Sequence, residues 1–229
     1  MSALVSVIIP LHNGERHLAD ALASVAAQTH PEVECIVVDD GSTDGSPHIA
    51  RAAAGVRYVR QPNAGVAVAR NTGLTVARGD YLAFLDQDDR FHPEKLARQV
   101  AALAGAAGAG FCFVREQVVC EDGQAYPDWL PEPTAPGDHL SFVPGTWLVR
   151  RDVFQRVGYF DASYRTGSDT DWMFRAREAG VPHCLVEEPL LIRRVHAGNH
   201  SHQQAVLRAD FLRALRESAR RRRARAAPL

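Results

Sequence analysis

The sequence has no apolar run of about 18 residues, which is the length that a helix needs to cross a bilayer. The stretch from Leu4 to Pro10 is too short for the core of a signal peptide, and no cleavage pattern follows it. No two cysteines have C-x-x-C spacing, so we expect buried free thiols in a reducing compartment, at Cys35, Cys112, Cys120 and Cys184. These absences favour a cytoplasmic protein without a membrane span.

Lysine is almost absent, and the balance of charge is uneven along the chain. The formal net charge of -1 argues against bulk binding of nucleic acid. Lys95 is the only lysine, whereas seven arginines lie between Arg213 and Arg225 with a single acid, Glu217. The tail from Gln203 onward is predicted to be a basic helix or to be disordered.

The first half of the chain alternates between short β-branched runs and stretches of helical periodicity. Strands are expected at residues 5–9, 34–38, 56–59 and 81–85, and helices at 15–27, 46–54, 66–77 and after Pro93. Such repetition with short connections predicts a doubly wound, mostly parallel sheet within one domain.

The second half is less regular. The predicted elements are a hairpin of 111–119 and 124–126 around Asp122-Gly123, a proline-rich loop at 126–144, a strand at 145–150, a helix at 171–179 and one or two strands at 185–195. This half therefore does not continue the strand–helix repetition of the first half.

Polar segments follow four of the predicted strands, at residues 11–13, 39–40, 61–63 and 86–88. In doubly wound sheets, ligands bind beyond the carboxyl ends of the strands. We therefore expect these four segments to converge at one edge of the sheet.

The segment Asp86-Gln87-Asp88 directly follows the predicted strand at 81–85. Two carboxylates at this spacing can hold a divalent cation, and oxygen ligands suit Mg²⁺ or Mn²⁺. A bound cation can in turn hold a diphosphate and stabilise the charge that develops on it. The alternative is a solvated turn that caps the helix after Pro93.

Two further segments carry groups that could contact a nucleotide. A carboxylate at Asp39 or Asp40 could accept the N–H of a pyrimidine base, while Gly41 allows the backbone to approach closely. Simple turn chemistry explains the same residues. Likewise, Pro10 either fixes a functional turn or only ends the first strand.

Four segments, in this order, resemble the motifs of the family 2 glycosyltransferases. They are VSVIIPLHN at residues 5–13, VVDDGSTD at 37–44, NAGVAVARN at 63–71 and GDYLAFLDQDD at 79–89. The resemblance runs from residue 4 to about residue 100 almost without gaps. Weaker similarity to the family's acceptor-side segment, its Glu-Asp catalytic segment and a histidine-bearing stretch follows at residues 143–161, 167–177 and 196–201.

The resemblance implies an α/β fold of the GT-A type, a doubly wound and mostly parallel sheet with a smaller acceptor-side region. We expect a single glycosyltransferase domain with three parts. These are a nucleotide-sugar-binding half at residues 1–105, an acceptor-binding and catalytic half at 106–202, and a basic tail at 203–229.

The resemblance also implies a donor site for a nucleoside-diphosphate sugar, with UDP-sugars expected first. The residues expected to contact the donor are Pro10, His12, Asn13, Asp40, Gly41, Arg70, Asp86 and Gln87. Those expected around a Mn²⁺ or Mg²⁺ ion are Asp88, Asp86 and His196. A zinc site at His196, His200 and His202 is not expected, because Gly198-Asn199 disfavours the helix that such spacing would need.

The resemblance makes Asp169 the general base that removes the proton of the acceptor hydroxyl. The family usually has a glutamate before the base, and this chain has Ser168 there, so Asp171 could share or take the role. Capping of the following helix explains both acids equally well and is compatible with catalysis.

The three tryptophans have two interpretations. An indole face can stack on the C–H surface of a sugar, and it can equally pack in a core. We expect Trp172 to lie in the core, and we leave both options open for Trp129 and Trp147.

Together these features predict an inverting, metal-dependent hexosyl- or N-acetylhexosaminyltransferase. The Q-x-x-R-W element of processive synthases is absent, so single transfers are expected. The acceptor stays unknown and could be a glycan, a lipid-linked sugar, a small molecule or a peptide. The basic tail is either solvated or in contact with anionic lipid or a polyprenyl-phosphate acceptor, which would make the protein peripheral to the inner face of a membrane.

Two alternatives remain. Ser168 would fit a catalytically impaired module that binds sugar nucleotides. A sugar-phosphate nucleotidyltransferase would share the layout but needs a glycine-rich, basic triphosphate loop after the first strand, and residues 11–15 do not provide one. A nicotinamide oxidoreductase is set aside because no G-x-G-x-x-G follows that strand.

Overall fold

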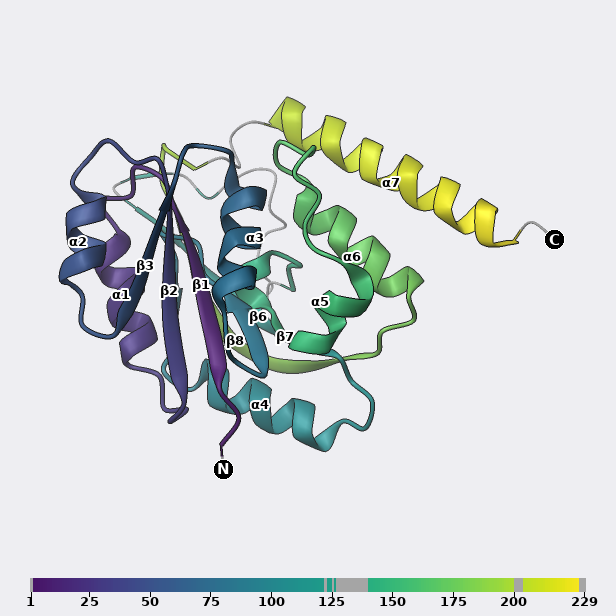
Figure 1. Ribbon diagram of the computed structural model, residues 1–229, viewed down its shortest axis with the longest axis horizontal. Helices are drawn as coiled ribbons and strands as arrows, with labels where there is room; N and C mark the ends of the chain where they lie inside the picture. The colour runs from purple at the N-terminus through teal and green to yellow at the C-terminus, as the bar shows by residue number, and fades with distance from the viewer. Residues whose placement is uncertain (1, 122, 125, 127–139, 200–203, 227–229) are drawn as a thin grey trace.

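The computed structural model describes residues 2–121, 123, 124, 126, 140–199 and 204–226. Its centre is an eight-stranded sheet in the order β3-β2-β1-β4-β7-β6-β8-β5, with helices on both faces (Figure 1). This is the α/β, mostly parallel architecture that the strand–helix repetition predicts.

The N-terminal half supplies four parallel strands and the helices that connect them. The strands are β1 (Val5–Leu11), β2 (Val33–Asp40), β3 (Val56–Gln61) and β4 (Tyr81–Phe84), and the helices are α1 (Leu18–Ala26), α2 (Ser46–Ala52) and α3 (Val66–Val76). Every residue of β1 is buried, as an unbroken apolar run predicts for a central parallel strand. Ile8 pairs with Ile36 of β2 on one side and with Phe84 of β4 on the other.

The second half completes the sheet with antiparallel and parallel pairs. Its elements are β5 (Arg90–Phe91), α4 (Lys95–Gly105), β6 (Phe111–Cys120), a 3-10 turn at Pro144–Thr146, β7 (Leu148–Arg150), α5 (Arg151–Val157), α6 (Ser168–Glu178), β8 (His183–Val195) and α7 (Gln204–Ala226). β7 runs antiparallel to both β4 and β6, whereas β6 and β8 are parallel. The return of β8 along β6 carries the chain back to the edge where β1, β2 and β4 end.

Two apolar clusters cover the two faces of the sheet. Because side chains alternate along a strand, Val7 and Ile9 enter the cluster formed with α1, α2 and α4. Ile8, between them, enters the cluster formed with α3, α5 and α6. The ends of the strands lie between the two apolar clusters and can therefore carry polar groups.

β1 and β2 extend further than the sequence predicts, because Pro10 and Asp40 still belong to the strands. The N–H of Leu85 donates to the carbonyl of Ile8, so the backbone N–H and C=O groups of the even-numbered residues of β1 point towards β4. β4 has ended by the level of Pro10. The proline therefore costs no ladder hydrogen bond, and the strand passes through it.

Several elements of the second half differ from expectation. The second arm of the predicted hairpin is wrong, because Gln124 and Tyr126 are outside strands and β6 pairs with β7 and β8; residues 122 and 125 lie outside the described residues. The segment at 185–195 is one strand that passes Pro189 through an irregularity in register. The predicted strand at 145–150 is shorter, and α6 begins at Ser168.

The aromatic core absorbs two of the three tryptophans. Trp147 and Trp172 are fully buried, and their rings stack with centroids 5.2 Å apart. Core packing is therefore confirmed for Trp172 and is the outcome for Trp147, whereas Trp129 lies outside the described residues. All four cysteines are free thiols, but Cys120 and Cys184 are only partly buried.

The tail forms helix α7, which lies along α6 at one side of the molecule (Figure 1). The alternative of a disordered tail is thereby excluded for residues 204–226. Within the described residues, neither α7 nor any other helix combines the length and the apolar character needed to cross a bilayer.

Lys95, the only lysine, is fully buried at the start of α4. Its Nζ donates to Gln99 Oε1 at 2.9 Å and to the carbonyl of Trp147 at 3.4 Å, and it lies 4.1 Å from the ring centroid of Phe91. Gln99 in turn donates to the carbonyl of Cys112. These contacts join α4 to the sheet, but burial lowers the pKa of Lys95 to about 7 because water no longer solvates the ammonium group.

The lowered pKa of Lys95 predicts a pH-dependent stability. Between about pH 7 and 9 the unfolded chain holds a proton on Lys95 that the folded protein releases, so folding becomes more favourable as pH rises. We expect the free energy of unfolding of the wild type to rise relative to Lys95→Met, with a slope approaching about 1.4 kcal/mol per pH unit. Urea unfolding of both proteins across this range measures the difference, and parallel pH dependences would contradict the prediction.

Candidate active site

The segments after β1 and β4 are joined by the side chain of Gln87. Its Oε1 accepts the N–H of His12 at 2.8 Å, and its Nε2 donates to the carbonyl of His12 at 3.1 Å. This two-point contact fixes Asp86 and Asp88, on either side of Gln87, relative to the end of β1. The predicted convergence of these strand ends is therefore observed.

Asp40 organises the next two segments. Its carboxylate accepts the N–H groups of Ala64 and Gly65 at 2.8 Å each, and the Nε2 of Gln61 at 2.8 Å. The N–H groups are those of the turn that leads directly into α3, so Asp40 determines where α3 begins. Each carboxylate oxygen has two lone-pair sites, which leaves capacity for a ligand donor.

Asp39 has a different role from Asp40, although they are adjacent. Its fully buried carboxylate accepts the N–H of Ser42 at 2.8 Å and the hydroxyl of Tyr58. Burial raises the pKa of Asp39, but the hydrogen bonds from Tyr58 and Ser42 outweigh burial and leave the pKa below its usual value. Asp39 therefore builds the turn, and Asp40 is the member of the pair nearer to the site.

The turn after β2 is tight around Gly41. Gly41 has a φ of +76°, and a Cβ on it would lie 2.9 Å from the backbone nitrogen of Asn63. Asn13, with a φ of 52°, accepts the N–H of Thr43 on its Oδ1 at 2.8 Å. His12 is exposed, with its Nδ1 2.9 Å from the carbonyl of Asp40, and Pro10 is buried at the end of β1.

Arg70 extends from α3 to the D-x-D segment. It is buried, and its Nη2 donates to Asp86 Oδ1 at 2.8 Å. The Asp86 side chain nevertheless remains 40% exposed. Arg70 thus orients a carboxylate that is still open to a ligand, while its own Nε has no partner among the described residues.

Asp88 meets the C-terminal part of the chain. Its Oδ2 lies 3.0 Å from His196 Nε2 and 3.0 Å from Asn199 Nδ2. The predicted proximity of His196 to Asp88 is therefore observed across more than a hundred residues of sequence. Asn199 was not predicted from the sequence, where its only signal was its place within the similar stretch at 196–201.

Arg194, also missed by the sequence analysis, attaches the end of β8 to the acidic turn. Its N–H donates to Asp89 Oδ1 at 2.9 Å, and its Nε donates to the carbonyl of Asp88 at 3.0 Å. Burial and then repulsion from Asp88 and Asp86 raise the pKa of Asp89 well above its usual range. Three carboxyl groups are thus crowded into this turn, and a cation bound there would relieve their mutual repulsion.

The donor set fits a cation that is shared with a ligand. Among the described residues, no three His, Cys, Asp or Glu side chains form a group that could hold a metal by themselves. Mg²⁺ and similar ions typically take one or two protein carboxylates and complete their shell with substrate phosphates and water. Asp86 and Asp88, with His196 next to Asp88, match that pattern, whereas a closed zinc site would not.

Asp169 lies in the first turn of α6. It is partly exposed, yet its carboxyl is densely surrounded by protein. Burial raises the pKa of Asp169, the charge of Arg70 opposes this, and the charge of Asp86 adds to it. Because the charges of Arg70 and Asp86 both affect the pKa of Asp169, we infer that Asp169 lies near this ion pair.

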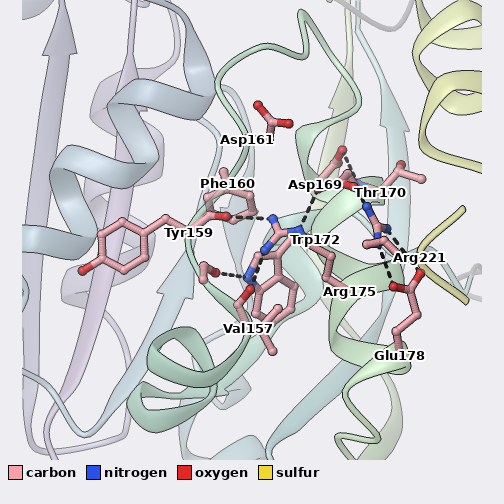
Figure 2. A network of polar contacts seen from close by, with 12 residues as sticks. Val157, Tyr159, Phe160, Asp161, Asp169, Thr170, Trp172, Arg175, Glu178 and Arg221 are labelled. Atoms are coloured by element: carbon pink, nitrogen blue, oxygen red, sulfur yellow. Dashed lines mark hydrogen bonds and ion pairs between the residues drawn. The ribbon is translucent and has the colours of Figure 1, made fainter. Parts of the chain in front are cut away.

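Asp171, two residues further along, is held by Arg175 and Arg221, which are both labelled in Figure 2. Its Oδ2 accepts Arg175 Nε at 2.8 Å, and its Oδ1 accepts Arg221 Nη1 at 3.1 Å. Arg175 also donates to the carbonyls of Val157 and Tyr159. Asp171 is therefore a structural anchor between α5, α6 and α7.

Helix α7 also holds the loop that precedes Asp169. Asp210 Oδ2 accepts the N–H of Thr166 at 2.8 Å and the N–H of Gly167 at 3.3 Å. Gly167 is the N-terminal cap residue of α6 and has no capping side chain of its own. Ser168 is buried, and its hydroxyl has no partner among the described residues.

A cavity of about 280 Å³ lies beside the donor residues, between the start of α3 and the loop that leads to α6. Its lining comprises residues 64–67 and 162–165. It adjoins Ala64 and Gly65, which bind Asp40, but it does not include the D-x-D segment. The cavity therefore extends the site towards the loop that α7 holds.

Comparisons with known proteins show which family and fold the chain resembles. A sequence model of the Glycosyl transferase family 2 matches residues 6–158. The putative teichuronic acid biosynthesis glycosyltransferase TuaG of Bacillus subtilis is 38% identical over 82% of this chain and 79% of its own length. The chain spans only 39% of the length of two similar glycosyltransferases, from Rickettsia felis and Rickettsia conorii.

Two solved structures show the same fold. S. aureus TarS 1-349 in complex with UDP-GlcNAc has a TM-score of 0.74 and 24% identity, over 94% of this chain and 65% of that one. The mannosyltransferase PcManGT from Pyrobaculum calidifontis, in complex with GDP-Man and Mn²⁺, has a TM-score of 0.75 and 18% identity, over 96% and 65%. The GT-A expectation is confirmed by these matches.

The tight turn at Gly41 predicts a steric cost for a methyl group. Gly41→Ala should lower the free energy of unfolding by about 1–2 kcal/mol for the positive φ alone, and further because of the contact with Asn63. Gly55→Ala is the matched control, because Gly55 has a φ of +74° and nothing within 4 Å of the added Cβ. Urea unfolding should show the larger loss at Gly41, and equal losses would contradict the steric argument.

Proposed function

The chain belongs to glycosyl transferase family 2, and on this premise we propose that it transfers a sugar from a nucleoside-diphosphate sugar to a hydroxyl group, with inversion and with the help of a divalent metal ion. The observation that carries the proposal is the convergence of Arg70–Asp86, Asp88–His196 and Asp169 beyond the carboxyl ends of β1, β2 and β4. Ligands of such sheets bind at this edge.

The donor binds along the segments that Gln87 and Asp40 tie together. The base and ribose lie against Pro10, His12, Asn13, Asp40 and Gly41, and the diphosphate lies towards Arg70, Asp86 and Gln87. We propose a UDP-sugar first, because TarS has been solved with UDP-GlcNAc, and a GDP-sugar second, because PcManGT has been solved with GDP-Man. A hexosyl or N-acetylhexosaminyl group is the expected cargo.

Asp88 and Asp86, with His196, are the residues that would hold Mn²⁺ or Mg²⁺. When bound, the ion neutralises the charge that develops on the leaving diphosphate. The protein contributes the orientation: Asn199 and His196 position Asp88, and Arg70 positions Asp86. The Mn²⁺ in the PcManGT structure supports this assignment.

The transfer step is a single displacement. The acceptor oxygen forms a bond to the anomeric carbon while the bond to the diphosphate oxygen breaks, and the diphosphate leaves with the electron pair. The proton of the acceptor hydroxyl passes to the carboxylate of Asp169. A raised pKa makes Asp169 a stronger base than a solvated carboxylate, and attack from the face opposite the leaving group inverts the configuration.

Asp169 is favoured over Asp171 as the base. Both carboxylate oxygens of Asp171 are engaged with arginines, and the side chain is buried away from the donor residues. A carboxylate whose two oxygens are both engaged in this way is not free to receive the proton of an acceptor hydroxyl. We therefore assign Asp171 to the framework of α6.

An impaired sugar-nucleotide-binding module is the second candidate. The observation in its favour is Ser168, which stands beside Asp169 where a glutamate was expected and whose buried hydroxyl forms no hydrogen bond among the described residues. This candidate predicts donor binding without turnover, so the two functions can be distinguished.

Replacement of the proposed base should remove turnover and spare binding. We expect Asp169→Asn to lower the release of UDP from a panel of UDP-sugars by roughly 100-fold or more, with UDP affinity within about twofold of wild type. In the wild type, activity should fall as pH decreases through the raised pKa of Asp169, because the protonated acid cannot accept a proton. Asp152→Asn, at an exposed aspartate of α5, is the control.

Wild-type turnover that Asp169→Asn leaves unchanged would refute the assignment of the base. Binding of UDP by a wild type that turns over none of the UDP- or GDP-sugars would instead favour the impaired module.

The metal assignment predicts a conditional binding defect. Calorimetry should show UDP binding that Mn²⁺ strengthens, and Asp88→Ala should remove this strengthening because it deletes the carboxylate that meets His196. Asp152→Ala serves as the control for loss of one negative charge. Equal Mn²⁺ dependence in Asp88→Ala and the control would exclude Asp88 as a ligand.

A further inference from the structure

Helix α7 has two faces of different character. The inner face contacts α6 and its preceding loop through Asp210, the fully buried Ala214 and Arg221. Arg213 adds hydrogen bonds to the carbonyl and hydroxyl of Ser163 at 2.9 Å and 2.7 Å. Through these contacts the inner face holds α6 and the loop before it, the segment that carries Asp169.

The outer face points away from the protein (Figure 1). Residues three or four apart on a helix share a face, and the residues that fall on this one are Arg208, Leu212, Leu215, Arg216, Ala219, Arg222 and Arg223, with Phe211 at its border, where its ring centroid lies 6.4 Å from that of Phe174 on α6. All of them are exposed. The large apolar members remain 47%, 49% and 40% exposed at Phe211, Leu212 and Leu215.

The arginines of the two faces differ in their partners. Arg221 on the inner face pairs with Asp171 and Glu178. Arg208, Arg216, Arg222 and Arg223 form no ion pair within the part of the chain that the structure describes. Their guanidinium groups are therefore available to an external anion.

The charge of α7 is opposite to that of the rest of the chain. Its eight arginines and two acids give the helix a charge of +6. The whole chain carries -1, so the remaining residues carry -7. A surface of this sign, with apolar side chains set among the arginines, is complementary to phosphate groups above an apolar phase.

We propose that this outer face of α7 docks onto the surface of an anionic lipid bilayer. The arginines contact lipid phosphates, and Phe211, Leu212 and Leu215 enter the boundary between headgroups and acyl chains. From Arg208 to Arg223 the helix spans about 22 Å, which covers several lipid headgroups. A bilayer can bind the arginines and the apolar side chains of this face at the same time, because its phosphates and its acyl chains lie a few ångströms apart.

Docking has a consequence for catalysis that rests on the proposed function. It brings the loop before Asp169 within about one helix diameter, roughly 10 Å, of the bilayer. A lipid-linked acceptor could then reach the base without leaving the membrane. The docking itself needs no turnover, so it can be tested separately from the proposed activity.

The test is sedimentation of the full chain with vesicles of phosphatidylcholine alone or with about 30% phosphatidylglycerol, in about 0.1 M salt. We expect binding only to the anionic vesicles, and weaker binding at higher salt. The combined change Arg216→Gln, Arg222→Gln and Arg223→Gln should weaken binding roughly tenfold or more. The combined change Leu212→Ser and Leu215→Ser should also weaken it, at unchanged net charge.

The matched control removes three exposed arginines elsewhere, by Arg51→Gln, Arg57→Gln and Arg78→Gln, which lie on or near α2, β3 and β4. Circular dichroism verifies that every variant is folded. Absence of binding to anionic vesicles, or an equal loss in the control, would overturn the proposal. Self-association that Leu212→Ser and Leu215→Ser abolish, without vesicle binding, would assign the face to a second copy of the chain and overturn it too.

Discussion

The hydrogen bonds from the N–H groups of Ala64 and Gly65 to Asp40 are the contact on which the site depends. A helix leaves its first N–H groups without intrahelical partners, and here a strand-end carboxylate takes those of the turn that leads into it. That fixes the start of α3 against the end of β2. Arg70, little more than one turn along α3, is then directed at Asp86. One buried carboxylate thus positions an arginine, which positions the exposed acid of the D-x-D segment.

The second half of the chain reaches the same place by a longer route. β8 pairs with β6 along its whole length, and this pairing carries Arg194 and His196 to the acidic turn after β4. The two halves therefore share Asp88, whose backbone is held by Arg194 and whose carboxylate meets His196 and Asn199. Neither half could keep Asp88 in this geometry alone, which explains why the site is built from both.

A structural feature could be predicted from the sequence where its signal lies within a short stretch of residues. β1 to β4 appear as apolar runs separated by amphipathic stretches, so their order, their parallel pairing and the meeting of their polar ends could be predicted. The hairpin after β6 was wrong because Asp122-Gly123 is a local turn signal, whereas the partner of β6 is β8, more than sixty residues away. The roles of Asp169 and Asp171 also could not be separated, because Arg221, which engages Asp171, lies fifty residues further along. Long-range pairing and ion pairs leave no periodic trace in a sequence.

Helix α7 shows how one element can serve the site and the surface together. Its inner arginines and Asp210 bind acids and N–H groups of α6 and its loop. The charge of +6 on α7 is also attracted to the charge of -7 on the rest of the chain, and this attraction favours packing of α7 against the protein whichever face of the helix turns inward. Such attraction alone would not choose a face. The face of α7 that packs against α6 is determined by Ala214, which allows close packing, and by the hydrogen bonds of Asp210 at the start of α6. Once α7 packs in this way, the helical repeat leaves Leu212 and Leu215 on the outside, together with the arginines that form no ion pair among the described residues. The contact that holds the segment of Asp169 therefore also determines which surface the protein presents.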